Sequence, residues 1–400
     1  MSKLKSFEEL RVIEIAEGVA GPCCGLLLAD LGAEVIKVEP RDGDRSREWG
    51  LPTESGDAAI FEHLNRGKRS IVLDPGENEG RNRLESLLAT ADVLVVHADP
   101  AEADAIGIDW KAAGDRHPRL VVCEINDMGE TGRFAGLPGS ELTLQAMSGF
   151  TRYIGDRGGE PCRVGFEIVG QATAMHAFQG IAAALYHRQA SGRGQYLSVS
   201  GLGAILSMKT ILFAAQSGDT DDWTGFHLNG PRWPADTGWD TKDGQVTFDF
   251  RHNQRDAWVK LCEALGLGHL PDDPEYEDWR STIYLGDRRF THGHPYREKF
   301  AVMTSAEVSA LINSLGGISV KFHDYGEVLS HPQVQLLDLL VDAADAPAEA
   351  RTQLGLPFRF AGEERSKTFG RAPRLDEHGA AILAELAGGT GRPVAKHVQN

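Results

Sequence analysis

Short apolar runs alternate with helical patterns through the first half of the chain, and no other feature of the sequence constrains the fold as strongly. Gly21–Pro22 is expected to form a turn before the first helix. Strands and helices that alternate at this spacing indicate βαβ units, so we expect an α/β fold with a mainly parallel sheet covered by helices. The expected strands are 10–15, 33–38, 70–73, 92–96, 120–125 and 196–200, and the expected helices are 24–31, 79–91 and 171–188.

The composition changes after about residue 217, where Gly, Asp, Pro and Trp become frequent. A long loop is expected there, followed by a strand over 245–250 and an amphipathic helix over 255–266. A further strand is expected over 356–362. The predicted division is therefore a large domain made of 1–217 and 326–400, with 218–325 as a linker and a smaller α/β domain.

The charge balance excludes two classes of partner. The chain has 41 lysine and arginine residues against 58 aspartate and glutamate residues, a formal net charge of −17. Nucleic acid and anionic membrane surfaces both need a basic partner, so neither is expected. No apolar run is long enough for a membrane span, and the first residues lack the apolar core of a signal peptide. Five scattered cysteines favour free thiols in a reducing cytoplasm.

Three local features allow more than one interpretation. The basic segment 65–69, with the sequence NRGKR, is suited either to holding phosphates or to forming a solvated loop before a strand. The adjacent Cys23 and Cys24 have no visible partner base, so core packing is favoured over reactivity. The THGH stretch at 291–294 offers two histidines without a third ligand, which favours a polar loop and no metal site.

Seven segments, spread in order along the chain, carry a resemblance to known proteins. They are LRVIEIAEGVAGPCCGLLLADLGAEVIKVEPRDGD, LNRGKRSIVLD, EINDMGETGRFAG, GRGQYLSVS, WVKLCEALG, LSHPQVQLLDLL and LPFRFAG. With these segments the chain resembles the class III CoA-transferases, the CaiB/BaiF family, over nearly all of residues 8–390.

The resemblance implies a fold and a reaction. Family members have a Rossmann-like large domain built from both chain ends and a smaller α/β domain, and they form interlocked dimers. They move CoA from a thioester to a carboxylic acid. A carboxylate nucleophile, an aspartate, attacks the acyl-CoA and forms an enzyme-bound anhydride, which divides one difficult exchange into easier steps. Related racemases and lyases use the same fold and the same aspartate.

The sequence departs from the family at the nucleophile. The family pattern VGxPIADLxxG matches the stretch 164–172, where Gly170 stands at the aspartate position. Shifting the register does not help, because the only aspartate between residues 157 and 220 is Asp219. A glycine has no side chain, so no anhydride can form at this position.

Other departures point the same way. Asp99 and Ala105 replace residues of the family's CoA-binding segment, and an acid at position 99 would repel a phosphate. Ser140 and Glu141 align with the aromatic–acid pair near the histidine position of the racemases, so the resemblance implies that the racemase base is missing too. The family's glycine-rich shielding loop has no match in 217–260. The leading hypothesis is a non-catalytic subunit of a heteromer, such as the benzylsuccinate CoA-transferases, whose paralogous partner supplies the aspartate.

Two alternatives remain open. Glu167, three residues before Gly170, is a candidate nucleophile or base for relocated transferase, lyase or racemase chemistry, and its other interpretation is a helix-start acid. His176 is a weaker candidate base. The second alternative is a CoA-binding scaffold or sensor. The resemblance implies CoA thioester as substrate, no permanently bound cofactor, and CoA-binding positions at Val19, Ala20, Arg41, Lys68, Arg69, Val72, Leu73, His97 and Ala98.

Overall fold

The chain forms two compact units in the computed structural model. The structure describes residues 6–98, 109–151, 160–209, 238–250, 254–277, 279, 295–361 and 368–388. Unit 1 comprises 1–150, 163–213 and 337–400, and unit 2 comprises 151–162 and 214–336. Both chain ends belong to unit 1. The predicted division differs from these units because 151–162, 214–217 and 326–336 belong to unit 2.

Unit 1 contains a six-stranded parallel sheet, as the alternation predicted. The strand order is β3-β2-β1-β4-β5-β6, so the direction of strand addition reverses between β1 and β4. Ile13 of β1 pairs with Ile36 on one side and with Leu94 on the other. The strands are β1 (Arg11–Ala16), β2 (Glu34–Glu39), β3 (Arg69–Val72), β4 (Val93–His97), β5 (Val121–Asn126) and β6 (Tyr196–Ser200).

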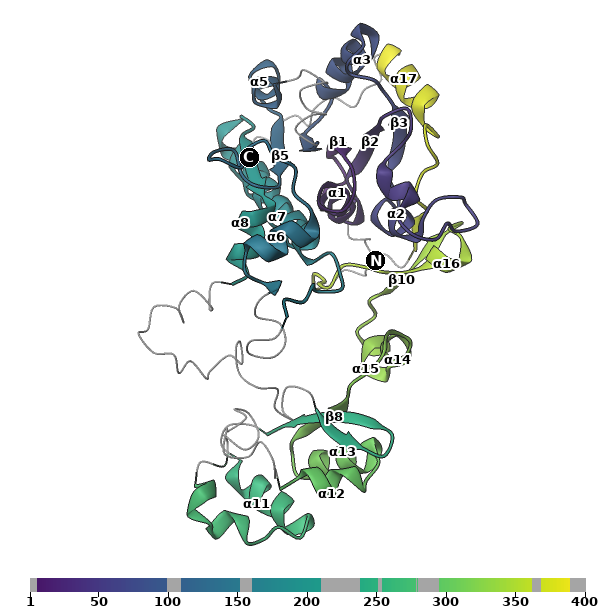
Figure 1. Ribbon diagram of the computed structural model, residues 1–400. Coiled ribbons are helices and arrows are strands. Elements are labelled where there is room, and N and C mark those ends of the chain that lie inside the picture. Colours follow the sequence, from purple (N-terminus) through teal and green to yellow (C-terminus); the bar gives the residue numbers. More distant parts are fainter. Residues whose placement is uncertain are drawn as a thin grey trace. The chain divides into compact units, whose positions relative to one another are not determined.

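Helices cover both faces of this sheet. On one face lie α1 (Ala20–Asp30) and α7 (Ile168–Ser191), and on the other lie α3 (Asn78–Leu88), α5 (Trp110–Arg116) and α17 (Gly379–Ala387). Figure 1 shows α17, from the end of the chain, beside α3 and β3. The remaining helices described in unit 1 are α2 (Ala59–Leu64), α6 (Glu141–Met147), α8 (Gly201–Ser207) and α16 (Ala348–Arg351).

Alternation along each strand builds two separate apolar layers. Val12 faces α1 and α7, whereas its neighbour Ile13 faces α3 and α17. Both side chains are fully buried. Strands buried on both faces are expected to be apolar almost throughout, which explains the continuous runs in the sequence. A small second sheet, β11-β10-β12, is formed by Thr352–Leu354, Leu340–Ala344 and Thr368–Gly370.

Unit 2 has its own core. Strands β7 (Trp239–Thr241), β8 (Gly244–Asp249) and β9 (Ile318–Lys321) form an antiparallel sheet. Helices α11 (Arg255–Ala264), α12 (Arg297–Ala301) and α13 (Ser305–Ser314) contribute to the core, and α14 (Tyr325–Ser330) and α15 (Pro332–Leu336) follow. Trp258 and Tyr296 are fully buried, and the indole nitrogen donates to the phenol oxygen over 2.5 Å.

Three local predictions were wrong. Gly21 and Pro22 lie inside α1 rather than in a turn, because a proline in the first helical turn gives up no intrahelical hydrogen bond. Helix α7 begins at Ile168, three residues before its predicted start. The expected strand at 356–362 is irregular over 356–361, and residue 362 lies outside the described residues.

Candidate functional site

The strongest candidate site lies where the strand order reverses. In open α/β sheets, ligands bind at the carboxyl ends of the strands beside such a reversal. Unit 1 has a cavity of about 310 Å³ at this place, which we call the switch-point pocket. Its lining comes from the ends of β1, β4 and β5 and from the starts of α1, α6 and α7. The lining residues are Glu17, Gly18, Val19, Ala20, Arg45, Trp49, His97, Ala98, Ile125, Asp127, Pro138, Gly139, Ser140, Glu141, Leu144, Glu167, Val169, Gly170, Thr173 and Gly201.

One wall carries a histidine and an aspartate from adjacent strand ends. His97 is the last residue of β4, and its Nε2 lies 3.4 Å from Oδ1 of Asp127, which follows β5. The other Asp127 oxygen accepts from the Gly139 amide over 2.6 Å. Burial tends to raise the pKa of Asp127, but His97 and the Gly139 amide outweigh it and lower the pKa overall. Asp127 is therefore an ionised acceptor that orients the imidazole.

The opposite wall is the start of α7, where a glutamate occupies the backbone donors. The Glu141 carboxylate accepts from the amides of Val169 and Gly170 over 2.9 and 3.1 Å, and from Gln145 Nε2 over 2.8 Å. Helix starts leave such amides without intrahelical partners, and a carboxylate satisfies them well. Glu141 therefore fills the anion-binding position that α7 would otherwise present to the pocket.

Glu167 lies beside this arrangement, and its neighbours shift its pKa in opposite directions. Arg163 donates to its Oε1 over 2.6 Å. Burial raises the pKa of Glu167, and the neighbouring Glu141 carboxylate raises it further, whereas Arg163 lowers it; the net direction is upward. Two carboxyl groups that share one site hold a proton more readily than either does alone.

Gly170 lies in the pocket with no room for a side chain. A Cβ added there would lie 2.8 Å from Cγ1 and 3.0 Å from Cβ of Val19, at the start of α1. Valine is stiff at χ1, so it cannot easily move aside. In this chain Val19 therefore fills the space where a residue-170 side chain would begin.

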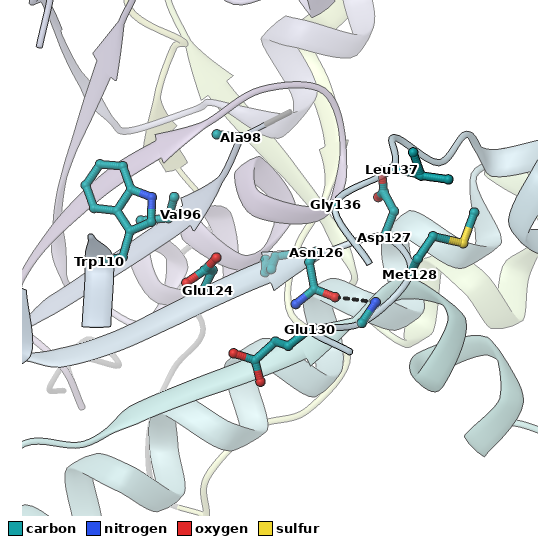
Figure 2. A pocket seen from close by; sticks show the side chains of 12 residues that line it. Val96, Ala98, Trp110, Glu124, Asn126, Asp127, Met128, Glu130, Gly136 and Leu137 are labelled. Carbon is teal, nitrogen blue, oxygen red and sulfur yellow. Dashed lines mark hydrogen bonds between the residues drawn. The ribbon is translucent and has the colours of Figure 1, made fainter. Parts of the chain in front are cut away.

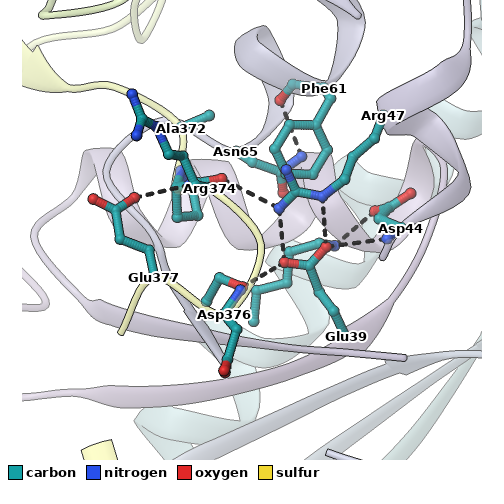
Figure 3. A network of polar contacts seen from close by, with 12 residues as sticks. Glu39, Asp44, Arg47, Phe61, Asn65, Ala372, Arg374, Asp376 and Glu377 are labelled. Carbon is teal, nitrogen blue, oxygen red and sulfur yellow. Dashed lines mark hydrogen bonds and ion pairs between the residues drawn. The ribbon is translucent and has the colours of Figure 1, made fainter. Parts of the chain in front are cut away.

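A buried network of charges supports the rim of the pocket. Asp44 Oδ1 accepts from the Gly18 amide over 3.2 Å, and Asp44 Oδ2 lies 2.7 Å from the Lys37 ammonium. Glu39 accepts two hydrogen bonds from Arg47, each 2.9 Å long. Figure 3 shows how Glu39, Asp44 and Arg47 converge, with Asp376 from the end of the chain close by. This network links the segment after β1, which carries Gly18, to the segment after β2, which carries Arg45.

The basic segment 65–69 does not reach the pocket. Lys68 is completely buried and its ammonium is bonded to Glu14 over 2.8 Å. Arg66 forms a buried pair with Asp30 over 2.6 Å. Arg69 begins β3, at the amino edge of the sheet, and contacts Glu34 and Glu385. The expectation that Lys68 and Arg69 hold a phosphate is thus opposed by their internal partners.

The other expected CoA-binding residues divide into two groups. Val19, Ala20, His97 and Ala98 line the switch-point pocket together with Glu167 and Gly170. Val72 and Leu73 lie at the carboxyl end of β3, at the same edge of the sheet but outside the pocket lining. Arg41 follows β2, is mostly exposed, and pairs with Glu77 over 2.7 Å. Asp99, Ala105 and the 291–294 stretch lie outside the described residues.

A second cavity adjoins the first, and sequence reasoning missed it. This Trp110 pocket has a volume of about 220 Å³ and shares Ala98, Ile125 and Asp127 with the switch-point pocket (Figure 2). Its other lining residues are Val96, Trp110, Glu124, Asn126, Met128, Gly129, Glu130, Gly136 and Leu137. Most of these residues lie in the segment 124–136, which the family resemblance marks without indicating a cavity, and the pairing of β4 with β5 brings Val96 opposite Glu124.

The thiols near the pocket are structural. Cys24 is fully buried, and Cys23 lies beside it half-buried, in the apolar layer under α1. Burial raises the pKa of Cys23 to about 11 and that of Cys24 well above its ordinary value. Neither is a thiolate near neutral pH, which confirms the core-packing interpretation.

Among the described helices, none combines the length and apolar character needed to cross a membrane.

His176 lies in α7 beyond the pocket lining. Its Nε2 is 2.7 Å from the hydroxyl of Ser207 in α8. This contact joins α7 to α8, so His176 contributes to helix packing.

Comparison with known proteins places the chain in a family. The sequence model of CoA-transferase family III matches residues 7–379. A succinate–glutarate CoA-transferase of Agrobacterium fabrum is 31% identical over 94% of this chain and 94% of its own length. A succinyl-CoA:mesaconate CoA-transferase of Haloarcula hispanica is 29% identical over 96% of this chain and 98% of its own length. This chain belongs to CoA-transferase family III.

Solved structures agree with this assignment. A CaiB/BaiF family protein from Brucella suis is 26% identical, with a TM-score of 0.77 over 94% of this chain and 98% of that one. A Mycobacterium tuberculosis protein, 24% identical, shares the fold with a TM-score of 0.78 over 96% of this chain and 100% of that one. The Rossmann-like α/β fold expected from the resemblance is therefore confirmed.

Proposed function

We propose that this chain is the non-catalytic subunit of a heteromeric CoA-transferase that moves CoA from an acyl-CoA donor, such as succinyl-CoA, to an organic acid. The single observation that supports this most is Gly170. It lies in the pocket at the position that the family motif assigns to the nucleophile, and Val19 occupies the space beside it. The assembly's nucleophile would come from a paralogous subunit with an aspartate at the matching position.

The chemistry of the family reaction explains why the assembly would need a nucleophile from another subunit. In the family reaction a carboxylate oxygen attacks the thioester carbonyl, a C–O bond forms, the C–S bond breaks, and CoA leaves as its thiolate. Of the carboxylates lining this pocket, Glu141 is held by two amides and Asp127 by His97 and Gly139. Both are held as acceptors by neighbouring groups, which opposes nucleophilic attack.

The charges that line the switch-point pocket also favour a non-catalytic role for this chain. Four carboxylates line it, from Glu17, Asp127, Glu141 and Glu167, against one arginine, Arg45. An organic acid would be repelled by this excess of negative charge. We expect Arg41, Val72 and Leu73, at the carboxyl edge of β2 and β3, to contact the nucleotide of CoA. Lys68 and Arg69 are not expected to contact it.

Exposed apolar side chains fit a chain that assembles with a partner. In α14 and α15, Tyr325 is 86% exposed and Leu336 is 79% exposed, and Leu329 between them is 48% exposed. Clustered exposed apolar residues mark interaction surfaces more often than solitary ones do. An interlocked arrangement with a paralogous subunit, as the family resemblance implies, would cover this surface.

The test is to purify the tagged chain from its native cells and weigh the intact complex. We expect a stable assembly with a chain of similar size that carries aspartate where this one has Gly170. The pair should transfer CoA, and the pure chain alone should neither transfer CoA nor gain mass when incubated with acyl-CoA. Transfer by the pure chain would overturn the proposal.

One observation favours a second candidate, an active enzyme that uses Glu167. This carboxyl lines the pocket, and burial together with Glu141 raises its pKa toward the range useful for acid–base work. If the purified chain is a homomer with activity, Glu167→Gln should abolish that activity. Unchanged turnover in Glu167→Gln would exclude this candidate.

A further inference from the structure

The outer edge of the parallel sheet in unit 1 is covered by a segment from much later in the chain. Among the described strands, β3 ends this sheet and pairs only with β2. An edge strand presents backbone donors and acceptors that no other strand satisfies. Residues 371–378, which we call the C-terminal clasp, bond to this edge just before α17 begins. In Figure 3 part of the clasp lies beside Glu39 of β2, with Asp376 close to it.

The clasp bonds to β3 partly through side chains, where a further strand would use only its backbone. The His378 amide donates to the Ser70 carbonyl over 3.0 Å. In return, the Ser70 amide donates to Nδ1 of the His378 ring over 3.2 Å. The Val72 amide donates to Oδ1 of Asp376 over 2.9 Å. The closure of this edge therefore depends on the protonation state of two side chains.

The backbone of the clasp is held in a conformation that depends on its contacts with β3. Asp376 has a φ of 56°, in the left-handed region that residues with a Cβ rarely adopt. Docking supports this conformation from two sides, because the Asp376 amide donates to the Ser70 hydroxyl over 3.0 Å while its carboxylate accepts from Val72. Such strain persists only while the surrounding contacts hold it. Loss of one contact with β3 therefore favours release of the whole clasp.

His378 is the group whose proton decides whether the clasp can bind. Its Nδ1 accepts from the Ser70 amide, so this nitrogen carries no proton in the docked state. An imidazolium is protonated on both nitrogens, so protonation would place two donors opposite each other. Histidine is the side chain whose ordinary pKa lies between pH 5 and pH 8. Mild acid thus removes an acceptor from the edge of the sheet.

The surroundings of the ring favour the neutral form that the clasp needs. Burial lowers the pKa of His378 below its ordinary 6.5, and the nearby Arg69 and Arg371 lower it further. Glu377 opposes this shift but does not reverse it. With a lowered folded pKa, docking has its full stability above pH 6.5 and loses stability as the pH falls below that value. The charged groups of the adjoining elements are Glu39 of β2, Arg69 of β3, Glu385 of α17, and Arg371, Arg374, Asp376 and Glu377 of the clasp.

We propose that the C-terminal clasp is an acid-sensitive switch: when His378 gains a proton, the clasp leaves β3 and the edge of the sheet opens. The proton comes from the solvent and stays on the imidazole ring. Release exposes the amides of Ser70 and Val72 to water. It also withdraws the Asp376 amide from the Ser70 hydroxyl, which donates to Glu39 over 2.6 Å.

Hydrogen exchange of the full chain, followed by mass spectrometry, tests this switch. The readout is the protection of the peptide that covers Ser70 and Val72, corrected for the intrinsic exchange rate at each pH. In the wild type this protection should fall about 5- to 10-fold between pH 7.5 and pH 5.5. A group of ordinary pKa 6.5 that cannot bind its proton while docked shifts the equilibrium by about that factor. The protection of β1, in the interior of the sheet, should stay unchanged.

Three variants separate the histidine from the rest of the clasp. In His378→Gln an amide oxygen can accept from the Ser70 amide but does not titrate, so protection should differ by less than about 2-fold between the two pH values. His187→Gln, at an exposed histidine of α7, is the matched control and should keep the wild-type pH dependence. Asp376→Ala removes a different acceptor. It should lower protection about 3- to 10-fold at both pH values and keep the pH dependence.

Three results would overturn the switch. Equal wild-type protection of the β3 edge at both pH values would show that the clasp stays docked in acid. A loss in acid that His378→Gln shows as well would show that another group titrates. A loss that spreads equally to β1 would show that acid unfolds the whole unit. A loss confined to the β3 edge and absent from His378→Gln would support the switch, whether or not the chain transfers CoA.

Discussion

The basic segment 65–69 and the start of α7 both looked like ligand-binding elements, yet the fold uses them in opposite ways. Lys68 is wholly buried and bonded to Glu14, whereas Glu167 and Gly170 line an open pocket. The positive charges of the basic segment are paired with partners inside the protein. The start of α7 keeps Glu167 and Gly170 in the lining of the pocket, although the Glu141 carboxylate occupies the amide of Gly170.

The position of each segment in the sheet explains the difference. Arg69 begins β3, at the amino edge, while Ile168 begins α7 near the carboxyl edge where the strand order reverses. Ligand sites of open α/β sheets lie at the carboxyl edge. A cluster of cations in a sequence therefore predicts a phosphate site only when its place in the strand is also known.

The largest expected effect comes from breaking the buried pair in the basic segment. Lys68→Ala removes an ammonium that contacts Glu14 at 2.8 Å in a completely buried setting. Loss of one partner from such a pair costs about 3–5 kcal/mol. Urea unfolding should be measured for Lys68→Ala and for Arg41→Ala, a control at an exposed residue, and the two losses in the free energy of unfolding compared. A loss below 1 kcal/mol in Lys68→Ala, together with weakened CoA binding, would restore the phosphate interpretation.

The pH dependence of stability sharpens the same comparison. Burial tends to raise the pKa of Glu39, but Arg47 and Lys37 lower it below its ordinary 4.5 in the folded state. A lowered folded pKa gives stability that is present above pH 4.5 and is lost as the pH falls further. Glu39→Gln should therefore be less stable than wild type at pH 7, and the gap should close in acid. A gap that is constant between pH 7 and pH 3 would contradict this origin.

At Gly170 we expect the effect of an added methyl group on stability to change sign with the residue at position 19. Gly170→Ala gains helix propensity of about 1 kcal/mol but meets Val19, and overpacking costs about 1–3 kcal/mol. The single variant should thus range from neutral to destabilised by about 2 kcal/mol. In a Val19→Ala background the same change should stabilise by about 1 kcal/mol. Thermal unfolding of the four proteins in this cycle would test it, and strict additivity would show that Val19 does not block the position.

The smallest expected effect is at Glu167. Its raised pKa means that the ionised carboxylate is disfavoured in the folded protein, so its cost is present at neutral pH and disappears as the pH falls. Glu167→Gln should be slightly more stable than wild type at pH 7, with the gain offset in part by the lost contact to Arg163. The difference should shrink toward pH 4, as measured by unfolding at both pH values. A gain that grows in acid would reverse the assigned direction.

The parallel sheet could be predicted because its strands are buried on both faces. Val93–His97 and Val121–Asn126 are nearly continuous apolar runs; Asp92 precedes the first and Asp127 follows the second. The family resemblance also predicts a register for Gly170, and that register stays a prediction. Both inferences depend only on local sequence.

The residue pairs that meet at the two pockets could not be predicted from local sequence. Glu141 meets Gly170 across 29 residues, and Tyr196 meets Glu124 across 72 residues. These partners depend on helix placement and strand pairing, which no single segment specifies. The predicted strand at 356–362 failed for the same reason, because an apolar run does not form a strand without a neighbour to pair with.

Two buried arginines of the N-terminal half have a consequence for synthesis. Arg66 completes its contacts with Gln353, 287 residues later, and Arg47 meets the carbonyl of Pro373, 326 residues later. At about 5–20 residues per second, the ribosome needs roughly 15–60 s to deliver those partners. Until then these arginines lack partners that the finished protein supplies, so a nascent chain presents a different surface to chaperones than the mature protein does.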